Sequence, residues 1–187
     1  MSGFFIEKNY CMFSRQDVIV PEFAVKYFEA TTAEDVTDAI SSSTKKIKKL
    51  LKKIPKKKID YAYAEGKWTI KELLQHVIDA EKVFSFRALW FTRQDISPLP
   101  GFDENSWAAA SKASSRKWKE MVAEFLTIRE ATQIFFESLD DDQLKTTGTA
   151  NNNLMNVGGL GFICAGHVMH HIGIIKERYL SKKKLEA

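Results

Sequence analysis

The chain has 187 residues, of which 44% are hydrophobic and 12% aromatic. This composition excludes a disordered chain and predicts one globular domain with a sizeable core. The formal net charge of +4 is local, because nine lysines and no acids fall between Lys45 and Lys58. The remaining 19 basic residues (28 less these nine) face 24 acidic ones, so the charge does not indicate a generally basic protein.

The lysine run itself has two interpretations. Such a run is most often the solvated face of an amphipathic helix, and the alternative is a contact with nucleic acid or an anionic membrane. No arginine or aromatic residue is interleaved with the lysines, so neither bidentate phosphate binding nor base stacking is indicated. We therefore expect no nucleic-acid partner and no membrane partner.

Cysteine usage and hydropathy indicate the compartment. Cys11 and Cys164 show no spacing typical of a disulfide framework or a metal site, which suits a reducing, cytoplasmic setting. The apolar start of the chain is soon interrupted by charge, so we expect no secretory signal there. No run approaches the roughly 20 apolar residues of a membrane span.

The first part of the chain, residues 1–29, predicts an N-terminal extension that packs on a main domain of residues 30–187. Within the extension, Val18–Pro21 is expected to be extended, because a proline disfavours helix in the residue before it. A first long helix is predicted to begin near Thr31, where Thr31–Glu34 matches a capping box, and to end near Pro55. Apolar residues recur along it at three- and four-residue steps.

Three further helices follow. The second should begin at Thr69, where Thr69–Glu72 is a capping box, and should run to about Gln94. The third spans about Trp118 to Leu139, and a polar loop then leads to the fourth, which runs from about Leu160 to Leu180. No alternation strong enough to predict a strand competes with this pattern. Four long amphipathic helices favour an all-α fold, a four-helix bundle.

Histidines are the candidate metal ligands. Three of the four in the chain, His167, His170 and His171, fall in one apolar helical segment. His167 and His171 lie one turn apart on the same face, a spacing at which two imidazoles can bind one divalent metal if a further ligand is supplied. His76, on the apolar face of the second helix, can supply it. The spacing alone leaves His170 as an alternative to His171.

A single histidine on an apolar helix face is more often a core residue than a ligand. Burying three unpaired imidazoles would cost about 1–3 kcal/mol each, which favours a shared ion. Asp79, one turn beyond His76, is the candidate catalytic residue, either orienting a ligand or acting as a base. Cys164 lies on the line of the fourth-helix histidines, but a small buried hydrophobe needs no metal role.

Several short motifs occur in a fixed order along the chain. They comprise Gly66–Glu72, His76 with Asp79, Glu81 and Arg87, Pro98–Asp103, Gly166–His167 with His170–His171, and Glu177–Leu180. Together they resemble the DinB/YfiT-like superfamily of metal-dependent bundle proteins. The resemblance covers most of the chain from about Tyr27 onward.

The resemblance implies an up-down-down-up four-helix bundle that is often a homodimer. It also implies a divalent metal, usually zinc or nickel, held by one histidine of the second helix and a His-x-x-x-His pair of the fourth. Carried onto this sequence, the ligands are His76, His167 and His171, and His170 is left outside the set.

Relatives of this type resemble thiol-dependent transferases or isomerases that use low-molecular-weight thiols, and others are described as hydrolases. We therefore expect a metal-dependent enzyme that activates such a thiol, or water, for transfer to or hydrolysis of a small-molecule substrate. The alternative hypothesis is a non-enzymatic protein, a metal-binding or structural dimeric bundle whose site is vestigial.

Overall fold

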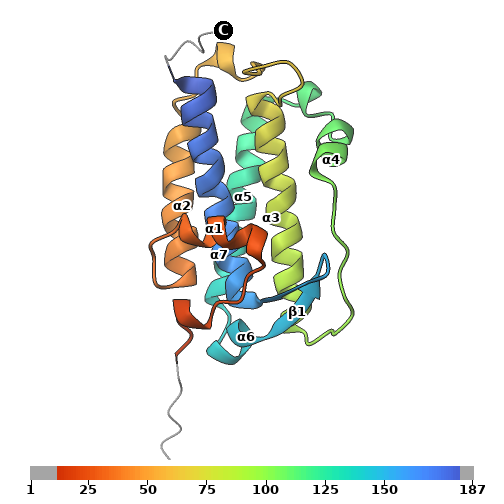
Figure 1. The fold of residues 1–187 in the computed structure, drawn as a ribbon. Helices are drawn as coiled ribbons and strands as arrows, with labels where there is room; N and C mark the ends of the chain where they lie inside the picture. The colour runs from red at the N-terminus through yellow and green to blue at the C-terminus, as the bar shows by residue number, and fades with distance from the viewer. Residues whose placement is uncertain (1–11, 182–187) are drawn as a thin grey trace, which may run out of the picture.

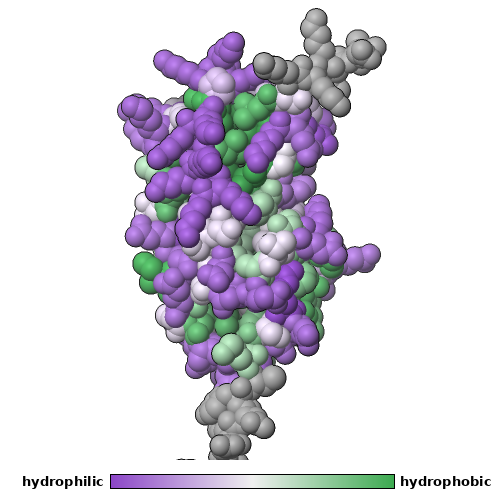
Figure 2. Space-filling model, turned by 90° about the vertical axis from the view of Figure 1, so that its left-hand side faces the viewer, coloured by the Kyte–Doolittle hydropathy of each residue, from purple (hydrophilic) through white to green (hydrophobic). Residues whose placement is uncertain are grey.

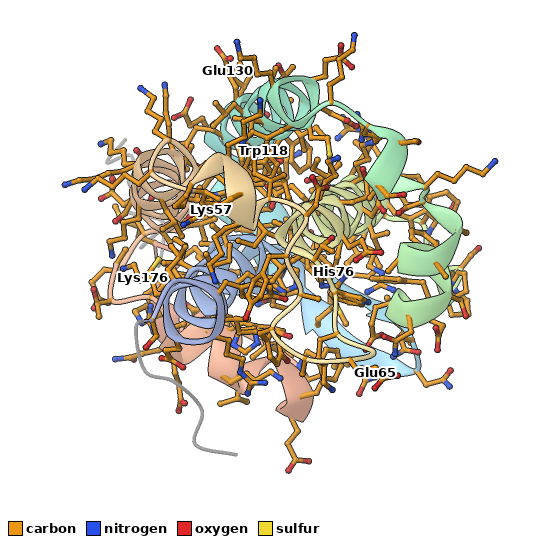
Figure 3. All side chains as sticks on the ribbon, turned by 90° about the horizontal axis from the view of Figure 1, so that it is seen from above. Lys57, Glu65, His76, Trp118, Glu130 and Lys176 are labelled. Carbon is orange, nitrogen blue, oxygen red and sulfur yellow. The ribbon has the colours of Figure 1, made fainter. Side chains whose placement is uncertain are left out.

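The computed structural model describes residues 12–181. Four long helices form a bundle: α2 (Val36–Leu51), α3 (Ile70–Thr92), α5 (Trp118–Glu137) and α7 (Val157–Ile174). In Figure 1, α2 and α7 run in one direction along the long axis, and α3 and α5 run in the other. The predicted all-α, up-down-down-up four-helix bundle is therefore confirmed. Figure 3 looks along the helix axes and shows the four helices side by side.

Shorter elements surround the bundle. α1 (Val25–Glu29) packs across α7, and α4 (Glu104–Ala110) lies beside α3 (Figure 1). α6 (Asp141–Lys145) precedes a hairpin of β1 (Thr147–Ala150) and β2 (Asn153–Asn156). A π-helical segment, Ile175–Leu180, continues α7. Four short 3₁₀ segments complete the described secondary structure: Arg15–Asp17, Glu22–Ala24, Lys56–Lys58 and Ala113–Ser115.

Helix starts follow their caps. α3 begins where predicted, because the Thr69 backbone N–H donates to the Glu72 carboxylate (2.7 Å) and the Glu72 N–H donates to the Thr69 hydroxyl (3.1 Å). The start predicted for the first helix near Thr31 is wrong. Asp35 caps α2 instead, accepting from the Thr37 and Asp38 backbone N–H groups at 2.7 and 3.0 Å.

The expectation of a polar loop without strands before the fourth helix is also wrong. β1 and β2 pair antiparallel, with Ala150 opposite Asn153. The two residues of the turn, Asn151 and Asn152, have φ of 50° and 59°, the left-handed backbone of a tight hairpin turn. Neither four-residue strand, Thr-Gly-Thr-Ala or Asn-Leu-Met-Asn, alternates apolar and polar side chains, so the period of two gave no signal.

The apolar faces of the helices form the core. α7 is buried along most of its length, and with its π-helical continuation it is apolar and long enough to cross a membrane by composition. However, 78% of that apolar window is buried inside the bundle, as in a core helix. Four lysines of α2 are exposed, while Ile47 between them and Leu50 directly after them are buried, and Figure 2 shows hydrophilic side chains over much of this side.

The described part of the predicted extension, residues 12–29, packs on the bundle. Its helix α1 contacts α7, and Arg15 donates to the backbone oxygen of Ala33 at 2.8 Å. The boundary predicted at residue 30 stays a prediction. Cys11 and the residues in which we expect no secretory signal lie outside the described part of the chain.

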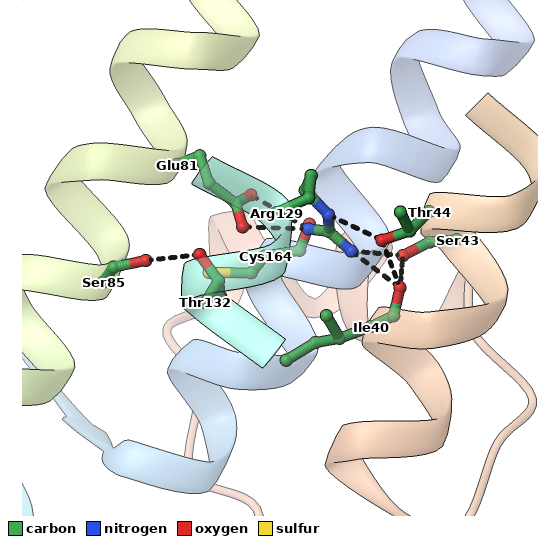
Figure 4. A network of polar contacts seen from close by, with 8 residues as sticks. All are labelled: Ile40, Ser43, Thr44, Glu81, Ser85, Arg129, Thr132 and Cys164. Atoms are coloured by element: carbon green, nitrogen blue, oxygen red, sulfur yellow. Dashed lines mark hydrogen bonds and ion pairs between the residues drawn. The ribbon is translucent and has the colours of Figure 1, made fainter. Parts of the chain in front are cut away.

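A charged cluster lies inside the bundle (Figure 4). Arg129 of α5 is 0% exposed, and both oxygens of the Glu81 carboxylate, on α3, lie 3.0 Å from its Nη1. Its other hydrogen bonds reach α2 and α7, where the acceptors are Ser43 Oγ, Thr44 Oγ1, and the backbone oxygens of Ile40 and Cys164. One guanidinium therefore joins all four helices of the bundle.

Candidate metal centre

Three imidazoles meet between α3 and α7. Nε2 of His167 lies 3.1 Å from Nε2 of His76 and 3.0 Å from Nε2 of His171. One ligand nitrogen from each of the three rings lies within 4.8 Å of the others. Figure 3 labels His76, the residue that α3 contributes. The structure thus brings together the three residues that the sequence predicted as ligands.

The geometry of these rings fits a metal ion better than hydrogen bonds alone. A ring nitrogen has one in-plane hydrogen-bonding position, so His167 Nε2 can pair with only one of its two neighbours. Two metal–nitrogen bonds of about 2.0–2.1 Å place their nitrogens about 2.9 Å apart at a right angle and about 3.3 Å apart at the tetrahedral angle. The observed separations of 3.0 and 3.1 Å fall in this interval.

Burial keeps these histidines neutral, which is the state that binds metal. Desolvation lowers the pKa of His76 to about 4, against a smaller opposing effect of Glu104. Desolvation first, and the neighbouring histidines second, hold the pKa of His167 and of His171 well below 6.5. His171 Nδ1 is buried without a hydrogen-bond partner among the described residues.

These shifts predict that the metal-free protein loses stability as pH falls from 7 to 5. The unfolded chain takes up protons at imidazoles with a pKa near 6.5, whereas His76 in the folded chain stays neutral until about pH 4. The free energy of unfolding is therefore undiminished above about pH 6.5, the pKa of a histidine in the unfolded chain, and it falls below that pH. For His76 alone the loss is about 2 kcal/mol at pH 5. Urea unfolding at both pH values measures this loss, and it should be smaller in His76→Gln. Equal stability at the two pH values would contradict the burial of neutral rings.

The imidazoles face a cavity of about 440 Å³. Its wall includes α1, which packs directly against α7 at Gly166. A Cβ at this position would overlap the backbone oxygen of Tyr27, so the absence of a side chain allows the close approach. The Tyr27 ring consequently packs edge-on against His167, with ring centroids 5.3 Å apart. On the other side, the Trp68 indole lies 4.9 Å from the His76 ring.

The other predicted residues lie elsewhere. His170 lines the same cavity, but it is outside the cluster of three ligand atoms. Asp79 does not line this cavity: its carboxylate accepts a hydrogen bond from Gln75 Nε2 (2.9 Å), and none of its described contacts is to a histidine. The Cys164 thiol is fully buried, and this burial raises its pKa well above the usual value.

Sequence reasoning assigned no role in this cavity to its charged residues, although it noted Arg87 as part of a motif. Lys26 of α1, Arg87 of α3 and Glu104 of α4 all line it. Glu104 is the acid of this wall, and its negative charge raises the pKa of both His76 and Tyr27, although burial has the larger effect on each. No local pattern signals these residues, because they come from three separate elements.

An all-α bundle with three convergent imidazoles defines a helix-bundle protein with a candidate metal centre. The sequence model of the DinB superfamily matches residues 39–175, and the chain belongs to this superfamily.

Comparison with a solved structure supports the fold. YfiT from Bacillus subtilis, described as "a probable metal-dependent hydrolase with an unusual four-helix bundle topology", aligns with a TM-score of 0.64. The alignment covers 85% of this chain and 87% of YfiT at 17% sequence identity. At this identity the likeness shows a shared fold.

Two curated relatives are each named "Putative metal-dependent hydrolase". One, from Oceanobacillus iheyensis, is 27% identical over 96 residues, which cover 49% of this chain and 55% of the relative. The other, from Geobacillus thermodenitrificans, is 27% identical over 124 residues, covering 65% and 68%. The chain thus spans about half the length of the first relative and two thirds of the second.

Proposed function

We propose that this protein is a metal-dependent enzyme that binds a divalent cation through His76, His167 and His171 and acts on a small molecule in the adjoining cavity. The convergence of three Nε2 atoms from two helices carries this proposal. Imidazole ligands suit zinc and nickel, which are the cations that we propose. A divalent metal bound there would supply Lewis acidity and lower the pKa of water or of a thiol.

The chain contributes the remaining features of the site. Three neutral imidazoles leave the charge of a divalent cation uncompensated, which favours an electron-rich or anionic group nearby. Lys26 and Arg87 add positive charge to the same cavity, and Glu104 offers a proton acceptor. Aromatic rings around the histidines restrict access of bulk water to them.

Water and a low-molecular-weight thiol are the two nucleophiles that we propose. The names of the relatives support hydrolysis, and the resemblance described above supports thiol transfer. We expect the metal-loaded chain to turn over activated esters or amides with water, or electrophiles with a small thiol, and the chelated chain to be inactive. Full metal occupancy without turnover across both panels would favour the vestigial, non-enzymatic bundle. Homodimer formation stays a prediction that analytical ultracentrifugation can check.

Glu104→Gln is expected to lower kcat about 100-fold while metal content stays unchanged, because loss of a general acid or base typically costs 10²–10⁴-fold. Steady-state kinetics with elemental analysis of the same samples measures both quantities. The matched control is Glu130→Gln, an exposed acid on α5 outside the cavity. Equal rates for the two variants would exclude Glu104 from proton transfer.

A further inference from the structure

A second cavity, of about 390 Å³, lies next to the histidine cavity. α3, the loop 99–102 and α4 line it, on the side of α3 where α4 stands beside the bundle (Figure 1), and it opens to solvent past the exposed side chains of Phe86 and Trp107. Its wall is largely apolar and aromatic, with Val83, Phe86, Leu99, Pro100, Phe102 and Trp107 among the lining residues. We call it the side cavity. This volume and lining are typical of a site for a small organic molecule.

The two cavities share a wall. Arg87, Gly101 and Phe102 line both of them. The Phe102 ring also packs on Trp107, with centroids 4.7 Å apart, so one aromatic residue contributes to both spaces. A molecule with two chemically different ends could therefore place one in each cavity.

The shared wall is held by contacts from distant parts of the chain. The Leu99 N–H donates to Thr149 O (3.0 Å), and the Asn151 N–H donates to Leu99 O (2.9 Å), which ties the loop to the hairpin. A Cβ at Gly101 would overlap the Asn151 side chain, so the loop packs closely on the hairpin here. These contacts fix the side cavity before any ligand enters, which lowers the entropic cost of binding.

A cation lies at the junction. Arg87 is 5% exposed, and its Nη2 donates to the backbone oxygen of Pro100 at 2.9 Å. A guanidinium keeps its charge even when buried and presents further N–H groups in a fixed fork, a geometry suited to a carboxylate. Lys82 also lines the side cavity, but its ammonium pairs with Glu124 at 2.7 Å, and the Asp79 carboxylate there accepts from Gln75, so Arg87 is the cation that remains for a ligand.

We propose that the side cavity binds the apolar end of the substrate, an aromatic or branched aliphatic group attached to a carboxylate that Arg87 receives at the junction. That this ligand is a substrate rests on the proposed function. The substrate class that we propose is a small amphipathic carboxylate. The apolar end of the substrate fills the side cavity, its carboxylate lies at the junction, and the remainder of the molecule extends into the histidine cavity.

Binding of 2-naphthoate to the full-length chain, measured by titration calorimetry, tests the proposal. We expect saturable binding that Val83→Phe weakens at least tenfold, because the new ring occupies the side cavity. Ile134→Phe is the matched control, since Ile134 is 60% exposed on α5 and lines neither cavity; it should bind like the wild type. Circular dichroism checks that both variants fold.

The carboxylate is tested by comparing 2-naphthoate with neutral 2-naphthol. We expect the naphthoate to bind about tenfold more tightly, and Arg87→Lys, which keeps the charge but loses the fork, to reduce this preference. Absence of saturable binding, or wild-type affinity in Val83→Phe, would overturn the side cavity as a ligand site. Equal affinity for the two probes would overturn the role of Arg87.

The metal site can fail independently of this inference. The wild type should still bind 2-naphthoate saturably after a chelator has removed its metal, and Val83→Phe should keep its metal. If the wild type binds naphthoate but no divalent metal, the proposed function fails and the side cavity stands as a ligand site. If it binds metal but no naphthoate, the side cavity fails and the metal centre stands.

Discussion

The His167→Ala variant is expected to retain less than about a tenth of the divalent metal bound by the wild type. His167 is the central ring of the three, with its Nε2 within 3.1 Å of both partners. Two imidazoles would remain, and loss of a direct ligand should exceed the 10–100-fold that loss of a supporting residue costs in affinity. Elemental analysis of purified protein and calorimetric titration with Zn²⁺ and Ni²⁺ measure the effect.

His170→Ala is the matched control for this experiment. His170 lies on the same helix and lines the same cavity, but it is outside the ligand cluster, so this variant should keep its metal. Metal should also stabilise the wild type, by about 2.7 kcal/mol when free metal exceeds Kd 100-fold, and should leave His167→Ala unchanged. Full occupancy in His167→Ala, or loss of metal in His170→Ala, would show that the ligand set is wrong.

The sequence predicted the long helices well, because their signals are local. The capping box at Thr69, the apolar period of α3 and α5, and the nearly continuous apolar run of α7 depend on residues within a few turns of one another. The start of the first helix was predicted wrongly because a second capping residue lies close to the predicted one. Thr31–Glu34 matches a capping box, yet the Thr31 hydroxyl donates to Phe28 O at 2.9 Å, and Asp35 caps the helix.

The candidate site was predictable in part for the same reason. The spacing of His167 and His171 places them on a common face and the apolar face of the second helix offered His76, whereas the choice of His171 over His170 depended on the resemblance. Asp79 is three residues beyond His76, which is a rotation of about 300° around the helix axis, or 60° short of a full turn. That difference is enough to leave the carboxylate beside Gln75, at the side cavity.

The acid of the cavity wall could not be predicted from local sequence. Glu104 begins α4, whose position depends on the path of residues 93–103 after α3. That path is fixed by pairing of Leu99 with the β1–β2 hairpin, about 50 residues further along the chain. No spacing rule connects Glu104 with the histidines, because only the tertiary fold brings them to one cavity.

Arg129 is a further residue that sequence patterns misplace, because an isolated arginine on an amphipathic helix is normally exposed. Its burial predicts a large effect on stability. Arg129→Met leaves the Glu81 carboxylate, whose side chain is 2% exposed, buried without its cation. We expect the free energy of unfolding to fall by about 3–5 kcal/mol, the cost of removing one partner of a buried pair. Urea unfolding of the metal-free chain at pH 7 measures this loss.

A double variant separates the unpaired charge from lost packing. Arg129→Met with Glu81→Leu removes both charges, so it should be more stable than Arg129→Met alone. Lys117→Met is the exposed control: its partner Glu120 is 63% exposed, and loss of such a pair costs at most about 1 kcal/mol. A loss of about 1 kcal/mol or less in Arg129→Met would contradict a tightly coupled buried pair.

The same cluster bears on the metal centre. Glu81 lies five residues after His76 on α3, and the Cys164 carbonyl that Arg129 bonds lies three residues before His167 on α7. Arg129 therefore ties together the two helices that carry the ligands, close to the histidines along each. Arg129→Met should consequently weaken metal binding as well as folding, whereas Lys117→Met should affect neither. Unchanged metal affinity in a folded Arg129→Met protein would show that the bundle sets the spacing of α3 and α7 without this guanidinium.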